Sequence, residues 1–257
     1  MSQTQKIDTP STFNEIDTPN GILKYLKKNN NNYKFSSRYR YSVLDLVGCK
    51  RKSFYKQSGI LQEENIHDST LQSMWSTVRG NLLHQMTYAY NWRELDMEYK
   101  VELKNGKIAT VAGRLDMYDW KTKTIMDLKT TDMIKWNIKQ ENLPKTEHIL
   151  QLQIYDTIFS NYIPVEGLNL VYADMTDIVT FNIQRKDRRE WISQRIQEIE
   201  DSIDSKNTPN GEINSFCQFC PYQTRCYNDG NGLVEKPLSI PNNPSHQEKK
   251  LRNCDLK

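Results

Sequence analysis

Two aspartates and a lysine lie close together in mid-chain, in "GRLD", which ends at Asp116, and "DLK", from Asp127 to Lys129. If the intervening "YDWKTK" makes a tight connection, the flanking strands pair antiparallel and Asp116 falls opposite, or nearly opposite, Asp127. Opposed residues have β-carbons only about 4.5–5.5 Å apart, where like charges destabilise the pair. Asp127 and Lys129 share one face of their strand, and Leu128 points into the opposite layer. The pattern therefore predicts an acid pair that needs a cation.

A divalent hard cation suits such a pair. Mg²⁺ takes oxygen ligands, keeps several waters and is commonly held by one or two carboxylates together with a substrate phosphate. A metal ion in this position lowers the pKa of its bound water and neutralises charge on an attacked phosphodiester. Lys129 could then orient the attacking water. The simpler interpretation is an ion pair on the polar face of an amphipathic hairpin, in which Lys129 pairs with Asp127 or Asp116.

Apolar periodicity predicts the elements that position these residues. Residues 68–92 are expected to form a long helix, because apolar residues recur every three or four positions: Leu71, Trp75, Val78, Leu82 and Met86. Residues 96–131 alternate like a three-stranded meander, with Asn105-Gly106 as a hairpin turn. A second helix (146–162), two strands (167–174 and 177–184) and a long amphipathic helix from Asp187 to about Ser205 are expected to follow.

The predicted helices carry further chemical groups. Gly80 and His84 are four residues apart and therefore share a helix face. A lone helical histidine is usually structural, but an imidazole can also complete a nitrogen and oxygen metal site. Gln151 and Tyr155 present an amide and a phenol on one face of the second helix. They could position a substrate, or they could be ordinary residues at the edge of the core.

Composition and net charge indicate which partners and which cellular location to expect. The 257 residues carry a net charge of only +3, so a nucleic-acid partner would have to be met by a local basic surface. No apolar run approaches the roughly 20 residues of a membrane span, and the N-terminal residues lack the apolar core of a signal peptide. We therefore expect a cytoplasmic protein, in the host cell cytoplasm if the chain is viral, with no membrane partner.

The five cysteines are unevenly placed, with three of them in "FCQFCPYQTRC". In a reducing compartment, clustered cysteines favour a metal site over disulfides. Cys217, Cys220 and Cys226 cannot close a tetrahedral site alone. Cys49 lies at or just beyond the end of a short helix for which Ser42 is a plausible N-cap.

The order of "GNLLH", "GRLD", "DLK" and "QLQIY" resembles the RecB-like branch of the PD-(D/E)XK nucleases. The motifs of that branch are a helical histidine, a G-x-x-D strand, a D/E-x-K strand and a Q-x-x-x-Y helix. Its iron-sulfur members have one cysteine before the nuclease core and three behind it, spaced as Cys217, Cys220 and Cys226 are, and "DLVGCKRKSFY" around Cys49 resembles the upstream segment. The likeness extends from about residue 40 to 230 and is strongest to the CRISPR-associated Cas-four exonucleases and their viral relatives.

The resemblance implies a role for each candidate residue. His84, Asp116, Asp127 and the carbonyl of Leu128 would bind Mg²⁺ or Mn²⁺, Lys129 would assist the water, and Gln151 and Tyr155 would complete the catalytic set. Cys49, Cys217, Cys220 and Cys226 would ligate a [4Fe-4S] cluster. The residue pattern alone leaves zinc and an iron-sulfur cluster equally open, although zinc sites usually show two local C-x-x-C pairs. Cys254 would be a free thiol in the tail.

The expected fold is α/β: a PD-(D/E)XK (restriction-endonuclease-like) core with a central mixed β-sheet flanked by helices. An iron-sulfur region near the C-terminus would be closed by the N-terminal cysteine. The expected segments are a polar arm (1–35), a helical segment with the first cysteine (36–68), the nuclease core (69–210), the cluster region (211–230) and a polar tail (231–257).

The expected function is metal-dependent exonuclease cleavage of single-stranded DNA or DNA ends. It would serve CRISPR spacer acquisition beside the integrase proteins, or recombination, repair or replication of viral or cellular DNA. The sequence has no Walker A loop, so unwinding of duplex DNA would need a helicase partner. An oligomer is compatible with this interpretation. The alternative is a non-catalytic iron-sulfur or zinc DNA-binding subunit of a larger nuclease or integrase complex.

Overall fold

The computed structural model describes residues 38–62, 71–85, 87, 92–213, 217, 220–229 and 233–235, the backbone alone for 71–73 and 233–235. Several expectations lie outside these residues. They are the polar arm (1–35), the place of Met86 on its helix, Cys254, and all of the polar tail except 233–235.

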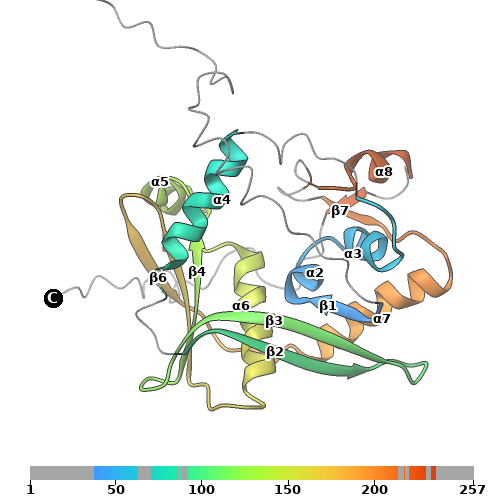
Figure 1. Ribbon diagram of the computed structural model, residues 1–257, viewed down its shortest axis with the longest axis horizontal. Helices are drawn as coiled ribbons and strands as arrows, with labels where there is room; N and C mark the ends of the chain where they lie inside the picture. Colours follow the sequence, from blue (N-terminus) through green and yellow to red (C-terminus); the bar gives the residue numbers. More distant parts are fainter. Residues whose placement is uncertain are drawn as a thin grey trace, which may run out of the picture.

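A mixed six-stranded sheet lies at the centre of the described part of the chain (Figure 1). Its order is β1-β3-β4-β5-β6, and β2 also pairs with β3. The strands are β1 (Arg40–Ser42), β2 (Trp92–Glu102), β3 (Ile108–Asp119), β4 (Thr124–Thr130), β5 (Gly167–Ala173) and β6 (Ile178–Asn182). The β1/β3 and β4/β5 pairs are parallel and the others antiparallel.

Strands β2, β3 and β4 form the predicted meander. The turn between β2 and β3 contains Asn105 and Gly106, and Gly106 has a φ of 74°, in the left-handed region that a side chain disfavours. The β3/β4 register pairs Met117 with Met126 and ends there. Strands β3 and β4 therefore separate at the residues that the sequence singled out.

The regular alternation of β3 is interrupted at Asp116. Leu115 and Tyr118 both belong to the main core cluster, although side chains three apart on a regular strand point to opposite faces. Glu94, which the β2/β3 register would place opposite Asp116, has a φ of 47° and is missing from the ladder. Asp116 is thus released from regular pairing at the point where β3 leaves β4.

Helices cover both faces of the sheet. Helix α6 (Thr146–Phe159) is buried almost all round, as expected for a helix within a core. On the other face, Leu83 of α4 (Leu71–His84) packs against a second cluster that includes Met126 and Leu128 of β4. The expectation of a central mixed sheet flanked by helices is confirmed.

The helix expected over residues 68–92 is shorter in the structure, where α4 spans Leu71–His84 and Trp92 already begins β2. Trp75 and Leu82 are about half exposed, at 50% and 49%, whereas Met74 and Val78 are buried. Apolar residues occur on several sides of this helix, so their spacing alone did not fix which side packs inward. Gly80 faces β4, because a Cβ there would lie 3.5 Å from the Thr130 hydroxyl oxygen.

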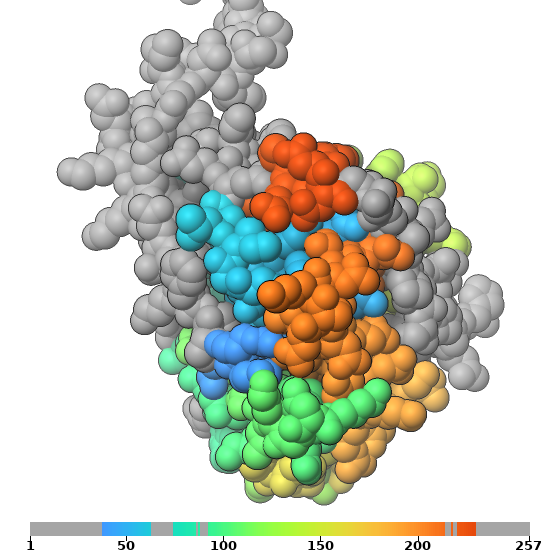
Figure 2. Space-filling view, turned by 90° about the vertical axis from the view of Figure 1, so that its right-hand side faces the viewer, coloured from blue at the N-terminus to red at the C-terminus, as the bar shows by residue number. Residues whose placement is uncertain are grey.

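The two ends of the described chain meet beside the sheet. Ser42 caps α2 (Val43–Val47) in a capping box with Asp45, as its position predicted. Helix α3 (Lys50–Gln57) packs on α7 (Arg189–Asp204), whose residues Ile192, Ile196 and Ile199 are fully buried. Figure 2 shows α3, α7 and α8 side by side on one face of the molecule.

Several short elements have no counterpart in the sequence interpretation. They are β1, α5 (Ile134–Lys139), β7 (Gly211–Ile213), α8 (Gln223–Asn228) and β8 (Leu233–Glu235), and α3 has one only in the broad helical segment expected over 36–68. Strand β8 falls within the predicted polar tail and pairs in parallel with β7. Segments of three to eight residues are too short for apolar periodicity to reveal them.

Candidate functional site

The acid pair lies where β3 and β4 separate. Continuing the register by one residue beyond Met117 and Met126 places Asp116 opposite Asp127. Asp116 does not join the ladder there, and its Oδ2 accepts the backbone N–H of Leu128 at 2.8 Å. The N–H and C=O of one strand residue point to the same edge, so the Leu128 carbonyl also faces the gap beside Asp116.

Asp127 is a buried charge, with a relative exposure of 1%. Its Oδ2 lies 2.8 Å from the Lys129 ammonium, which is its ion-pair partner. Burial raises the pKa of Asp127 to about 6, the nearby Asp116 carboxylate raises it as well, and Lys129 opposes the shift. Such a group is poised to accept a cation.

His84 brings an imidazole to the same gap. It is the last residue of α4, and its Nδ1 lies 3.9 Å from Asp116 Oδ2. Across the described ranges, no three His, Cys, Asp or Glu side chains approach closely enough to form a metal site, so the groups are neighbours without coordination geometry. Their donor types still fit a hard divalent cation: two carboxylates, one of which is buried, and one imidazole.

Gln151 and Tyr155 lie on the side of the sheet that carries Asp127. Gln151 Nε2 donates to Tyr155 Oη at 2.9 Å, and both side chains are buried. The pKa of Tyr155 is raised, first by burial and then by the charge of Asp127, so the phenol stays protonated. The Tyr155 ring also explains the glycine of "GRLD", because a Cβ on Gly113 would lie only 2.9 Å from it.

The comparisons with known proteins agree with this arrangement. The family model for the PD-(D/E)XK nuclease superfamily matches residues 41–227, a range that contains every candidate residue described above. The chain belongs to this superfamily. Among solved structures, 13 chains match it. No curated protein matches it.

One similar solved structure is named "Crystal structure of SSO0001". It has a TM-score of 0.56 and 24% sequence identity, and the match covers 80% of this chain and 94% of the other. At this identity the likeness concerns the fold. In the part of the chain that the structure describes, no helix is both long and apolar enough to cross a membrane.

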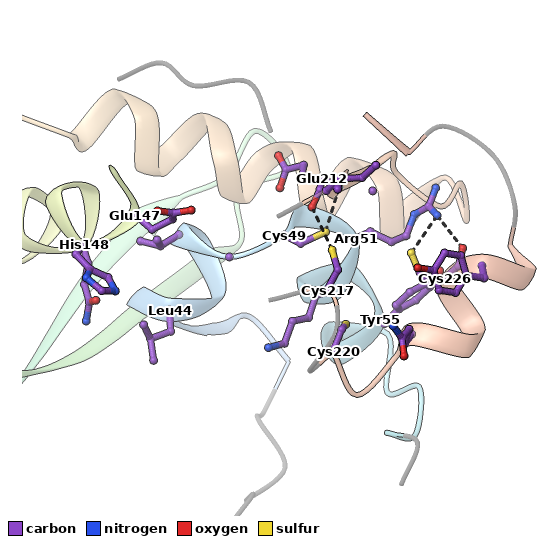
Figure 3. Close-up of a pocket in the computed structure, with 18 of the residues that line it drawn as sticks. Leu44, Cys49, Arg51, Tyr55, Glu147, His148, Glu212, Cys217, Cys220 and Cys226 are labelled. Atoms are coloured by element: carbon purple, nitrogen blue, oxygen red, sulfur yellow. Dashed lines mark hydrogen bonds between the residues drawn. The ribbon is translucent and has the colours of Figure 1, made fainter. Parts of the chain in front are cut away.

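Four cysteines of this PD-(D/E)XK chain line a single cavity of about 520 Å³. Cys49 precedes α3 as its N-cap residue, and Cys217, Cys220 and Cys226 come from the C-terminal segment. Lys129 and Gln151 line the same cavity, which therefore connects the cysteines with the acid site. Figure 3 shows the cysteines at one end of the cavity and His148 at the other.

The cysteine thiols have specific polar neighbours. The backbone N–H of Glu212 donates to Cys49 Sγ at 3.3 Å, and the Glu212 carbonyl lies 3.9 Å from Cys217 Sγ. Figure 3 shows Cys49 and Cys217 pointing toward one another beside Glu212. Burial raises the pKa of Cys220, and Cys49 and Cys217 contribute to the rise. The sulfurs line the cavity without converging on one point.

A buried ion pair anchors the cysteine end of the cavity. Arg195 binds both carboxylate oxygens of Glu212, at 2.7 and 2.6 Å, and donates to the carbonyls of Leu46 and Gly48. The same carboxylate accepts the backbone N–H of Lys50 at 2.7 Å. Glu212 thus joins α7 to the turn that carries Cys49.

The sequence interpretation missed Arg195 and Glu212. Arg195 follows Ile192 by three residues and precedes Ile199 by four, so it lies within the apolar stripe of its helix. A charge in such a stripe signals a buried partner, but nothing local identifies Glu212 as that partner. Arg51 was missed as well. Its guanidinium is buried and donates to Cys226 Sγ at 3.4 Å and to the Cys226 carbonyl.

Proposed function

We propose that this chain is a Mg²⁺- or Mn²⁺-dependent deoxyribonuclease that acts as an exonuclease on single-stranded DNA or DNA ends. The observation that carries the proposal is Asp127. Its carboxylate is buried, lies opposite Asp116, and is 2.8 Å from the Lys129 ammonium. Burial of an ionisable carboxylate lowers the stability of the fold, and carboxylates with pKa values shifted by burial are typical of functional sites.

Each member of the site has a part in this proposal. The cation would be held by His84, Asp116, Asp127 and the Leu128 carbonyl, and when bound it would lower the pKa of a water and neutralise phosphate charge. The Lys129 side chain lies beside Asp127, in position to orient the water. Gln151 and Tyr155 hold each other and pack against Gly113, so they fix the wall of the site next to Asp127.

DNA as substrate follows from the nuclease superfamily. The proposal includes cleavage of single strands or frayed ends. It also includes CRISPR integrase proteins or a helicase as partners. The process served would be spacer acquisition, or the recombination, repair or replication of viral or cellular DNA. These parts are supported by the four sequence motifs, which resemble those of the RecB-like branch and occur in the same order.

The cysteine cavity would hold a [4Fe-4S] cluster. Support comes from the four thiols that line one cavity and from the donors beside them, the Glu212 N–H at Cys49 and the Arg51 guanidinium at Cys226. Donors of this kind stabilise a thiolate. A zinc-loaded protein would be colourless and would contain no iron or acid-labile sulfide.

Cleavage assays test the catalytic part. Purified wild type is expected to degrade end-labelled single-stranded DNA in Mn²⁺. Asp127→Ala should abolish cleavage, and Lys129→Ala should lower the rate by about 10²–10³-fold, the usual cost of removing one fixed electrostatic contact to the developing charge. Lys121→Ala is the matched control, because Lys121 is an exposed lysine in the turn between β3 and β4.

The same assay separates the main proposal from its alternative. Wild-type protein that binds the DNA but leaves it whole would identify a non-catalytic DNA-binding subunit. Equal cleavage by wild type and Asp127→Ala would refute the proposed site. Shortening from one end, as opposed to internal cuts, would support the exonuclease mode.

A further inference from the structure

His148 lies in the first turn of α6, at the end of the cavity nearest the acid site. Its Nδ1 is 2.8 Å from Oη of Tyr172, a fully buried residue of β5. The two rings pack together with centroids 5.6 Å apart. The imidazole is therefore fixed from behind by a side chain on a different element.

The hydrogen bonds of Tyr172 determine the tautomer of His148. Tyr172 Oη accepts the backbone N–H of Lys145 at 3.0 Å, and within the described residues His148 Nδ1 is the one acceptor in reach of the phenol proton, so we assign that proton to the bond with Nδ1. Burial raises the pKa of Tyr172, which keeps that proton in place. A neutral His148 that accepts at Nδ1 carries its ring proton on Nε2.

The surroundings of His148 keep the ring neutral. Burial lowers its pKa well below the ordinary value, and the positive charges of Lys129 and Lys145 lower it further. The ring lines the cavity beside Lys129 and Gln151, as Figure 3 shows for His148 and Glu147 at this end. Its Nε2 has no hydrogen-bond partner among the described residues.

We propose that His148 is a substrate-binding residue of this nuclease, which donates its Nε2–H to a phosphate oxygen of the DNA strand next to Lys129. The inference rests on the proposed function and adds a residue to it. A phosphate is the fitting ligand because it only accepts hydrogen bonds and carries the negative charge that Lys129 attracts. A neutral donor adds a directed bond there without a second positive charge beside Lys129.

Two substitutions separate the donor from the ring. His148→Gln would keep an N–H₂ group near the position of Nε2, whereas His148→Asn would keep one only near Nδ1. Affinity for fluorescein-labelled oligothymidylate is measured in Ca²⁺, and cleavage in Mn²⁺. His148→Asn should weaken binding about tenfold or more, the effect of losing a hydrogen bond to a charged group, and His148→Gln should recover most of it.

Melting temperatures of both variants show whether the fold is kept, because a purely structural role would affect them without separating His148→Gln from His148→Asn in binding. Equal DNA affinity of His148→Asn and wild type would overturn the inference, and so would the lack of any binding by wild type. If wild type binds but does not cut in Mn²⁺, the proposed nuclease function fails, while the affinity difference still supports His148 as a phosphate contact.

Discussion

The acid site and the cysteine cavity are held together by different kinds of contact. Asp127 and Lys129 are placed by the β4/β5 ladder, and Asp116 follows directly where the β3/β4 ladder ends. Cys49 and Cys217 are far apart in sequence and meet through Glu212, which Arg195 anchors. Where backbone pairing positions a group, one side chain can be replaced without moving the others. Where contacts between side chains position a group, replacing one side chain frees the residues that it held in place.

The two regions also differ in what they do for the fold. The acid site places Asp127 in a buried position with a raised pKa, so its charge opposes folding. The cysteine cavity joins the two ends of the described chain, so any metal group bound there adds its binding free energy to folding. Substitutions should therefore lower stability at the cysteine cavity and activity at the acid site.

The largest effect is expected from Cys49→Ala. A structural metal site contributes on the order of 10 kcal/mol in small domains, which is comparable to the whole stability of a typical domain. The variant should lose bound iron and acid-labile sulfide and melt far below wild type. Its cleavage activity should fall only as the folded fraction falls. Metal analysis and thermal melting, each alongside cleavage assays at low temperature, check this.

Cys254→Ala is the control for that experiment, because Cys254 has no proposed partner. It should match wild type in iron content and melting temperature. The proposed difference between the cysteine cavity and the acid site would be wrong if Cys49→Ala kept its iron and its stability, or if it lost activity while fully folded.

Arg195→Ala should have the next largest effect. It leaves the Glu212 carboxylate buried without its charged partner, which costs about 3–5 kcal/mol in comparable buried pairs. Urea denaturation measures the loss, and the double variant Arg195→Met/Glu212→Leu should recover part of it. Arg114→Ala, which breaks the exposed pair with Asp96, should cost no more than about 1 kcal/mol. Similar losses for Arg195→Ala and Arg114→Ala would show that the buried pair contributes no more to stability than the exposed one.

More of the acid site than of the cysteine cavity could be predicted from the sequence. The facing acids could be predicted because Asp116 and Asp127 are joined by a short turn, and strand alternation then places Lys129 on the face of Asp127. The Arg195–Glu212 pair could not be predicted, because its members come from a helix and a three-residue strand that no periodic pattern reveals. His148 was missed for a similar reason, since its partner Tyr172 lies on another element.

The side of α4 that packs inward could not be predicted for a related reason. Leu71, Trp75, Val78 and Leu82 follow a helical repeat, but Met74 and Leu83 offer other apolar faces. The choice among them depends on the shape of the sheet, where Gly80 allows close approach to β4. The release of Asp116 from its ladder is also a tertiary feature, because it depends on the backbone of Glu94 in the neighbouring strand.

The smallest expected effect on stability is the pH dependence that Asp127 produces. Its folded-state pKa of about 6 lies above the ordinary value of about 3.9, so its stabilising contribution is complete below about pH 4 and is lost as the pH rises through about 6. Asp127→Asn cannot ionise, and without added divalent cation it should gain about 2 kcal/mol over wild type between pH 4 and pH 7. Urea denaturation across this range measures the difference.

Two comparisons sharpen that measurement. Asp96→Asn should not reproduce the gain, because hydrogen bonds from Arg114 hold the pKa of the Asp96 carboxyl below its ordinary value and give the opposite sign. Added Mn²⁺ should stabilise wild type at pH 7 and leave Asp127→Asn nearly unchanged, since the cation binds the ionised carboxylate. Parallel pH profiles for wild type and Asp127→Asn would mean that this charge is already satisfied in the folded protein, and the acid site would then resemble the cysteine cavity in supporting the fold.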